Sequence, residues 1–138
     1  MVDVDAIVYQ VLTQDGTALD ALIDGRAEYG MARPDFQNAQ AIVVYSPEDG
    51  EGRGFGVPVH ERSYLFECYG GDAATDSWAG AQQVYRALHD LWHDRGAVTV
   101  ASGVMANGYT EQAGIPAVNP KTKHKYIQCR MGGRFKGA

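Results

Sequence analysis

Two histidines, His89 and His93, have the spacing that comes closest to a metal site. Their i, i+4 separation would place both imidazoles on one face of a helix, as a helical zinc site needs. The glutamate of an H-E-x-x-H motif is absent, and the sequence offers no obvious third ligand. A protonated imidazole near a helix C-terminus is favoured by the helix dipole, which gives both residues a structural role. We therefore predict no metal and no cofactor.

Glycine occupies every second position from Gly50 to Gly56, which invites comparison with a phosphate-binding loop. Phosphate loops carry Gly-Lys-Ser/Thr and aim the N-terminus of the next helix at the anion. Here no such triplet is present, and the stretch leads into a strand-like run. We therefore interpret residues 48–58 as the tip of a long hairpin that becomes ordered against a partner.

Nucleophilic chemistry has no recognisable setting in the chain. The serines lack the G-x-S-x-G context, and Cys68 has no neighbouring base. The carboxylates of residues 48–51 stand in the glycine-rich stretch, where they would be hydrated and unperturbed. Cys68 and Cys129 lie in apolar strand-like runs, which predicts buried, reduced thiols; a bridge would require neighbouring strands. We expect a protein that is not an enzyme.

Hydrophobic periodicity predicts two main helical segments. The first covers residues 3–24, with Asp3 as N-cap, a break at Asp15-Gly16, and a short second helix that ends at Gly25. The second covers residues 73–94 and carries an apolar stripe that includes both tryptophans. These stripes would pack against a sheet.

Alternating or β-branched runs supply that sheet. We predict strands at residues 26–30, 41–45, 59–69, 97–105 and 123–131. We predict loops at residues 32–40 and 107–122 and a tail at residues 132–138. The runs on either side of the glycine-rich stretch fit a β-hairpin. The order α-β-β-β-α-β-β predicts one α+β domain over residues 1–138, a mostly antiparallel sheet packed against two main helices.

Composition narrows the class of protein. The chain has 138 residues, 45% hydrophobic and 21% charged, which suits one domain with a single core and not a disordered or membrane protein. The first five residues are acidic where a secretory signal would be basic, and no apolar run approaches the length of a spanning helix. The formal net charge of −5 disfavours a generally basic nucleic-acid binder.

The charge is unevenly distributed along the chain. Residues 1–120 hold all 17 acidic and six basic residues, whereas residues 121–138 hold six basic residues and no acid. The basic end also contains Tyr126 and Phe135, a composition typical of a nucleic-acid surface, and equally of a segment that docks on an acidic protein. A solvated tail is the third interpretation. An acidic body and a basic end favour head-to-tail contact between copies.

In order and length, these segments resemble the tail terminator, or tail completion, proteins of long-tailed bacteriophages and gene transfer agents. The similar pieces are the amphipathic helix 3–24, the strand 41–45, the charged strand 60–69, the helix 73–94 with Leu88-His89-Asp90-Leu91, and the closing strand pair that ends at 126–131. The family has no short invariant signature, so the resemblance lies in the pattern of nearly the whole chain. The glycine-rich stretches 48–58 and 108–120 depart from it.

The resemblance implies a structural virion protein, assembled in the cytoplasm of the host bacterium and located in the tail or neck. Such proteins form a ring, commonly a hexamer, that caps the tail tube, stops its polymerisation and offers a surface for head–tail joining. DNA passes through the lumen without specific binding, and no membrane is involved. We expect the contacts with neighbouring subunits or the tube to involve Gly50, Arg53, Phe55, Lys121, Lys123, Lys125, Arg130 and Arg134. Acidic partners for the basic residues include Asp15, Asp20 and Asp24 of a neighbour.

Three alternatives stay open. A head-side connector or stopper protein of the neck would have the same structural class. A small metal-binding or enzymatic domain would use His89 and His93. A nucleic-acid-binding module would use the basic residues 121–136, and its affinity for DNA would fall steeply with salt.

Overall fold

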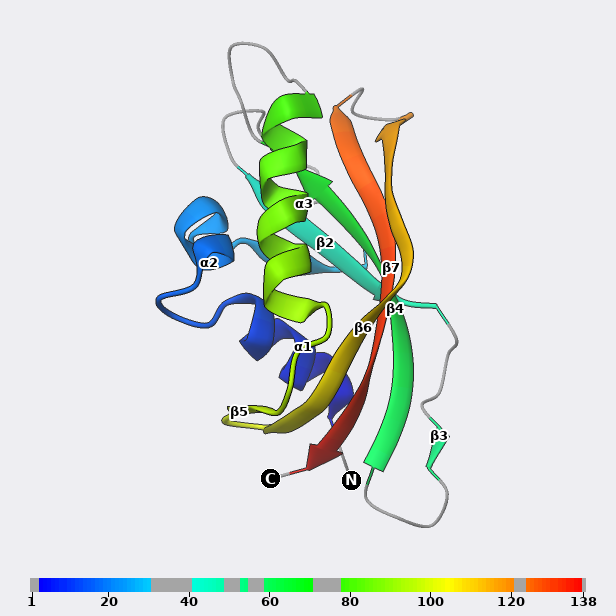
Figure 1. Ribbon diagram of the computed structural model, residues 1–138. Helices are drawn as coiled ribbons and strands as arrows, with labels where there is room; N and C mark the ends of the chain where they lie inside the picture. The colour runs from blue at the N-terminus through cyan, green and yellow to red at the C-terminus, as the bar shows by residue number, and fades with distance from the viewer. Residues whose placement is uncertain are drawn as a thin grey trace.

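The computed structural model describes residues 3–30, 41–48, 53–54, 59–70, 78–120 and 124–137. These residues form a curved sheet with helices packed on one face (Figure 1). The helices are α1 (Val4–Leu12), α2 (Ala18–Ile23) and α3 (Trp78–Trp92). The strands are β1 (Ala27–Tyr29), β2 (Ile42–Pro47), β3 (Arg53–Gly54), β4 (Val59–Tyr69), β5 (Val98–Val100), β6 (Gly103–Val118) and β7 (Lys125–Gly137).

The sheet is mixed. Its strand order is β1-β2-β4-β7-β6-β5, with the short β3 paired to β4 off this path. β1 runs parallel to β2, and every other pair in the described part of the chain is antiparallel. The α+β class and the β2–β4 hairpin are therefore confirmed, with Tyr45 opposite Phe66. The element order differs from the predicted one by the short β3 and by the division of 97–105 between β5 and β6.

The N-terminal helices begin and end where the local sequence predicts. The Asp3 carboxylate accepts a hydrogen bond from the Ala6 amide at 3.0 Å and caps α1. The Thr17 hydroxyl accepts one from the Asp20 amide at 3.1 Å and caps α2. After α2 the chain takes two left-handed residues, Asp24 (φ 48°) and Gly25 (φ 76°), which turn it into β1. The predicted helix, break and short second helix are confirmed.

The predicted loop at residues 107–122 is wrong, because β6 continues to Val118 along the edge of β7. Register shifts at Met105/Asn107, Thr110/Gln112 and Gln112/Ile115 interrupt its alternation. Proline is tolerated on such an edge strand, and glycine where a backbone approaches closely. A Cβ on Gly114 would stand 2.6 Å from the Ile127 side chain and 3.0 Å from the ring of Tyr85.

The predicted tail at residues 132–138 is also wrong, since β7 runs to Gly137 between β4 and β6. Glycine is required in this segment because neighbouring side chains lie directly over the strand. A Cβ on Gly132 would stand 2.5 Å from a carboxylate oxygen of Glu111 and 2.7 Å from the ring of Tyr109. Gly132 therefore lets two β6 side chains lie across the strand.

The core lies between the helices and the inner face of the sheet. It includes the stripes Ile7, Val8, Val11 and Leu12 of α1 and Ala81, Val84, Leu88 and Trp92 of α3. Cys68 and Cys129 are buried free thiols on the adjacent strands β4 and β7, as their apolar surroundings predict. Helix 73–94 is confirmed as α3 from Trp78, and residues 73–77 lie outside the described residues. No helix in the described ranges is long and apolar enough to cross a membrane.

Candidate assembly surfaces

The basic residues of the C-terminal segment lie on a central strand and not on a tail. Arg130 on β7 places a guanidinium nitrogen 3.5 Å from a carboxylate oxygen of Glu48 in the same chain. Arg134 stands opposite Glu61 in the register of β4 and β7. β7 therefore has acidic neighbours from its own chain. The prediction that the basic end is separate from an acidic body is wrong for the folded structure.

The structure describes some of the other predicted contact residues and does not describe the rest. Lys125 begins β7, and its ammonium lies 5.1 Å from the centre of the Trp78 ring. Arg53 belongs to β3, opposite Glu61 of β4, which extends the hairpin beyond β2. Gly50, Phe55, Lys121 and Lys123 lie outside the described residues. The structure thus places Lys125, Arg130 and Arg134 along one strand and does not gather them into one patch.

The outer face of the sheet, which points away from the helices, has two regions. Ile42, Val44, Tyr69 and Tyr126 form a second buried apolar cluster at one end, and polar side chains form a network at the other. The Tyr109 hydroxyl donates to Glu61 at 2.9 Å, and the Ser63 hydroxyl donates to Glu111. Burial, followed by the hydrogen bond to Glu61, raises the pKa of Tyr109 to about 12. Among the described residues of this face, Arg134 stands opposite Glu61 and Arg130 beside Glu48, which is unlike the continuous basic stripe of a nucleic-acid surface.

One surface that the charge pattern did not indicate is an open hollow of about 440 Å³ beside the start of α1. We call it the tyrosine hollow; it is lined by Asp3, Asp5, Ala6, Tyr9, Gln10, Tyr29 and Tyr45. Tyr9 on α1 is 42% exposed and Tyr29 on β1 is 54% exposed. Tyr45 is buried, with its ring edge-on to Tyr29 at 5.7 Å. The hollow therefore has aromatic walls and acidic residues at one end.

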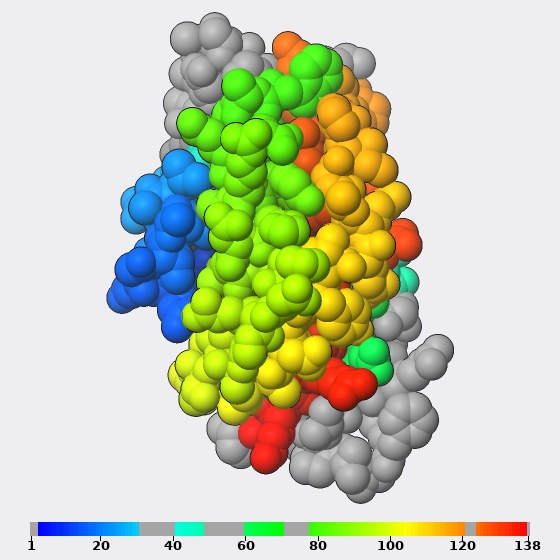
Figure 2. All heavy atoms as spheres, viewed as in Figure 1, coloured from blue at the N-terminus to red at the C-terminus, as the bar shows by residue number. Residues whose placement is uncertain are grey.

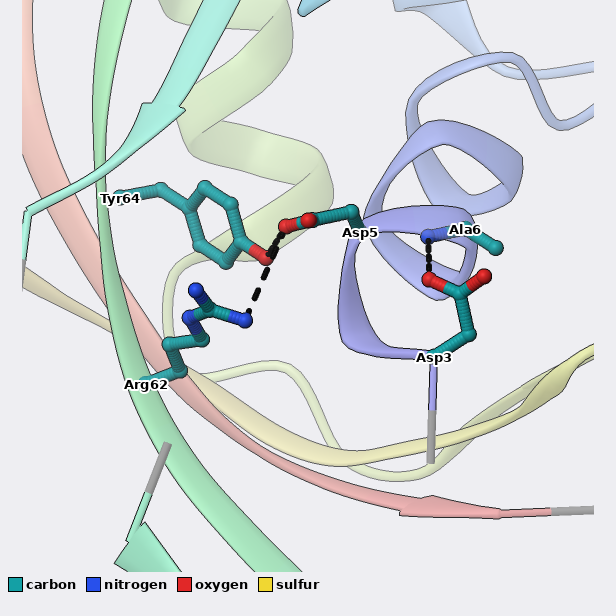
Figure 3. A network of polar contacts seen from close by, with 5 residues as sticks. All are labelled: Asp3, Asp5, Ala6, Arg62 and Tyr64. Carbon is teal, nitrogen blue, oxygen red and sulfur yellow. Dashed lines mark hydrogen bonds and ion pairs between the residues drawn. The ribbon is translucent and has the colours of Figure 1, made fainter. Parts of the chain in front are cut away.

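A hydrogen-bonded network fixes the acidic end of this hollow (Figure 3). The Tyr64 hydroxyl donates to Oδ1 of Asp5, and Nη1 of Arg62 lies 3.9 Å from the same oxygen. Burial, followed by the hydrogen bond to Asp5, holds the pKa of Tyr64 well above its usual value. Burial and the nearby Asp5 charge raise the pKa of Tyr45 to about 12. Both phenols are therefore neutral near pH 7, and the hollow suits a cationic group.

A sequence signal for the hollow did exist. Tyr9 lies off the stripe formed by Ile7, Val8 and Val11, so α1 carries a large aromatic residue on its polar side. Exposed single hydrophobic residues are common, and this one gained meaning only when the fold brought Tyr29 beside it. The missing information was that the fold brings Tyr9 of α1 and Tyr29 of β1 to the same hollow.

A second surface follows the free edge of β6. Trp78 and Val118 are 42% and 47% exposed, and we call these two residues together with Lys125 the edge ridge. Ile115, which is 45% exposed, pairs with Gln128 and lies on the other face of the strand. α3 and β6 lie side by side on the face shown in Figure 2. The Trp78 indole donates to the Ala117 carbonyl at 3.3 Å. The ridge thus combines apolar side chains with the Lys125 cation over an aromatic ring.

Part of the β6 edge is already satisfied within the chain. The Gly114 amide donates to the Tyr85 hydroxyl at 3.0 Å, and the Gly108 amide donates to the Arg95 carbonyl at 3.1 Å. An edge strand covered in this way is protected from indiscriminate pairing with other strands. Contact with a partner at the edge ridge would therefore depend on side chains more than on strand addition.

The two histidines have structural partners. His89 and His93 stack with their ring centres 4.5 Å apart. Nδ1 of His93 lies 2.8 Å from the Thr110 hydroxyl, and Nε2 lies 3.3 Å from a carboxylate oxygen of Asp94. Both ring nitrogens of His93 are therefore engaged, which does not suit a metal ligand. In the described part of the chain, no three metal-binding side chains come together.

Comparison with known proteins adds no assignment to this geometry. No protein family model matches the chain, and no curated protein sequence matches it.

Proposed function

We propose that this protein is a structural virion protein that forms a ring on the end of a bacteriophage or gene transfer agent tail tube. The ring stops growth of the tube and provides the surface for joining to the head. The observation that carries the proposal is the presence of two dissimilar exposed surfaces near opposite edges of one sheet. The tyrosine hollow adjoins β1, and the edge ridge lies on β6.

A closed ring of identical subunits needs this arrangement. Each subunit in a ring contacts one neighbour with one surface and the other neighbour with a different surface. A twofold dimer, by contrast, uses one self-complementary patch on both subunits. The hollow contains Asp3 and Asp5, whereas the ridge contains Lys125, so the two surfaces differ in charge as well as in shape.

The charge of the chain supports passage of DNA through the lumen. The formal net charge is −5, and the acidic Glu61 and Glu111 alternate with Arg134 on the outer face. Phosphates are repelled by acidic walls, and tight DNA binding requires release of counterions by many cationic contacts. A lumen with interspersed charges of both signs would let DNA slide.

The proposal is tested with the purified full chain, alone and mixed with the tail tube protein of the same genome. We expect native mass spectrometry to find one closed assembly, a hexamer by resemblance to the tail terminators. Electron microscopy should show that assembly at one end of each tube, and tubes should stop lengthening. Monomers alone, even with tube protein present, would overturn the proposal. Recovery of the chain on isolated heads and not on isolated tails would favour the head-side connector.

A further inference from the structure

We infer that the tyrosine hollow of one subunit receives the edge ridge of the next copy, with Lys125 and Trp78 entering between the tyrosines and Asp3. This inference rests on the proposed ring and specifies which surfaces meet in it. It commits to a second copy of this chain as the occupant of the hollow.

The hollow has the chemistry to hold an aromatic side chain and a cation together. It is open to solvent and offers about 440 Å³ of space beside its lining side chains. Tyr9 and Tyr29 are exposed aromatic side chains, and a cation over the face of such a ring is attracted by the ring quadrupole. Asp3 adds negative charge, whereas the charge of the 36% exposed Asp5 side chain is offset by Arg62 at 3.9 Å.

The ridge has the matching chemistry. Lys125 lies over Trp78, so cation and indole form one unit, and Val118, opposite Lys125 in the register of β6 and β7, continues its apolar surface. Tryptophan and tyrosine are the side chains that most often dominate binding energy at protein interfaces. Charge complementarity between Lys125 and Asp3 would fix the orientation of the contact.

Charge also argues against a contact between two hollows. Such a contact would bring Asp3 and Asp5 of one copy against the same residues of the other, and like charges across an interface are destabilising. A contact between two ridges would likewise oppose two Lys125 ammonium groups. Only the unlike pairing brings opposite charges together, and it leaves one surface of each kind open for the next subunit.

The hollow is held in shape before it binds. The Gln10 amide donates to the Ser102 hydroxyl at 2.7 Å and its oxygen accepts from the Ser102 backbone at 2.8 Å, which ties α1 to the β5–β6 turn. The bond between Tyr64 and Asp5 ties the start of α1 to β4. A preformed site loses less conformational freedom on binding, which favours association.

Matched single substitutions test the charge pairing. Asp3→Asn keeps a good N-cap and removes the negative charge, whereas Lys125→Glu reverses the charge of the ridge. We expect each to weaken subunit association about tenfold or more at low ionic strength, with a smaller effect in high salt. Asp90→Asn, on the exposed side of α3, removes one negative charge outside both surfaces. It is the matched control for Asp3→Asn and should leave association unchanged. Sedimentation equilibrium of the full chain measures all four proteins.

Mixing experiments test the pairing of surfaces. A hollow variant (Tyr9→Ser with Tyr29→Ser) and a ridge variant (Trp78→Ser with Lys125→Glu) should each be monomeric, with unchanged circular dichroism. Their equimolar mixture should form dimers and nothing larger, because one intact hollow meets one intact ridge. Self-association of either variant, or a mixture without dimers, would overturn the inference.

The outcomes separate this inference from the proposed function. If the unmodified chain forms rings and both double variants form the same rings, the inference fails and the proposed function stands. Variant rings that assemble normally but no longer bind tubes would assign the two surfaces to the tube protein and also overturn the copy-to-copy pairing. Absence of rings in the unmodified chain, with tube protein present, is the failure of the proposed function itself.

Discussion

The two faces of β7 differ as sharply as any two regions of this molecule. On the inner face, Ile127, Cys129, Met131 and Phe135 are buried beneath the helices. On the outer face, Arg130 and Arg134 stand among the acids of β4 and of the β2–β4 connection. A segment that is uniformly basic along the chain is therefore amphipathic in space. A basic segment of the sequence forms a basic surface only if the topology keeps that segment away from the acidic residues of the rest of the chain.

The largest expected effect is a difference in the free energy of unfolding lost when each of the two tryptophans of α3 is replaced by alanine. Trp92 is fully buried against Phe66, with ring centres 5.3 Å apart, and its indole donates to the Gly132 carbonyl at 2.9 Å. Trp92→Ala should lower the free energy of unfolding by about 3–5 kcal/mol, measured by urea denaturation. Trp78→Ala, at the exposed end of the same helix, should lower it by roughly 1 kcal/mol, in proportion to the smaller area removed from water. Similar losses for both would contradict the comparison.

Periodicity explains which elements were predictable. Strand β4 and the first half of β7, to Met131, alternate in sequence, and α1 and α3 carry continuous apolar stripes, so local sequence predicts them. The second half of β7 was predicted as a tail. β6 escaped prediction because its register shifts break the alternation, and its Gly114 and Pro116 have the composition of a loop. The direction of the three-residue β1 depends on its pairing with β2, which local periodicity does not specify.

The candidate surfaces show the same limit. Lys125 was predicted as a contact residue and lies on the edge ridge, where the predicted contact stays a prediction. Arg130 was predicted to meet acids of a neighbour, but Glu48 of its own chain lies beside it. Tyr9 and Tyr29 were missed because only the fold brings these two distant positions to one hollow. A linear pattern identifies residue types, whereas the partners of each residue come from the fold.

The next expected effect concerns an inner-face contact between β4 and a charged group, the bond from Tyr64 to Asp5. Tyr64→Phe keeps the buried ring and removes the donor. Because hydrogen bonds to charged groups contribute roughly 1.5–3 kcal/mol, and Arg62 stays near Asp5, we expect a loss towards the lower end of that range in urea denaturation. A loss below about 0.5 kcal/mol would show that the bond adds nothing to stability.

The same variant has a distinct pH dependence. The pKa of Tyr64 is higher in the folded chain than the value of about 10 expected in the unfolded chain. The stability from this shift is therefore complete below pH 10 and declines as the pH rises, since the unfolded chain then releases the proton first. Tyr64→Phe should show a shallower loss of stability above pH 10. Tyr109→Phe, on the outer face, should reduce that loss less, because its pKa rises only to about 12.

The same substitution, glycine to alanine, can be made on the inner face at Gly108 of β6 and on the outer face at Gly132 of β7. A Cβ on Gly108 would stand 2.5 Å from the Trp92 carbonyl oxygen and 2.9 Å from its buried ring, neither of which can move freely. Gly108→Ala should therefore cost roughly 1–3 kcal/mol by overpacking. Gly132→Ala meets the Tyr109 ring and the end of the Glu111 side chain on the outer face, which can shift towards solvent. We expect a smaller loss there by thermal denaturation, and the reverse order would contradict this.

The smallest expected effect is the ion pair between Arg130 and Glu48 on the outer face. Their side chains are 41% and 32% exposed, so water and salt screen the attraction. A double-mutant cycle with Arg130→Gln and Glu48→Gln should give a coupling of about 0.2–1 kcal/mol that falls with added salt. The same cycle, repeated on the assembled ring, tests whether the outer face stays exposed to water in the ring. If the outer face lines a water-filled lumen, the coupling stays small and salt-dependent; if a neighbouring subunit covers this face, desolvation strengthens the pair and removes its sensitivity to salt.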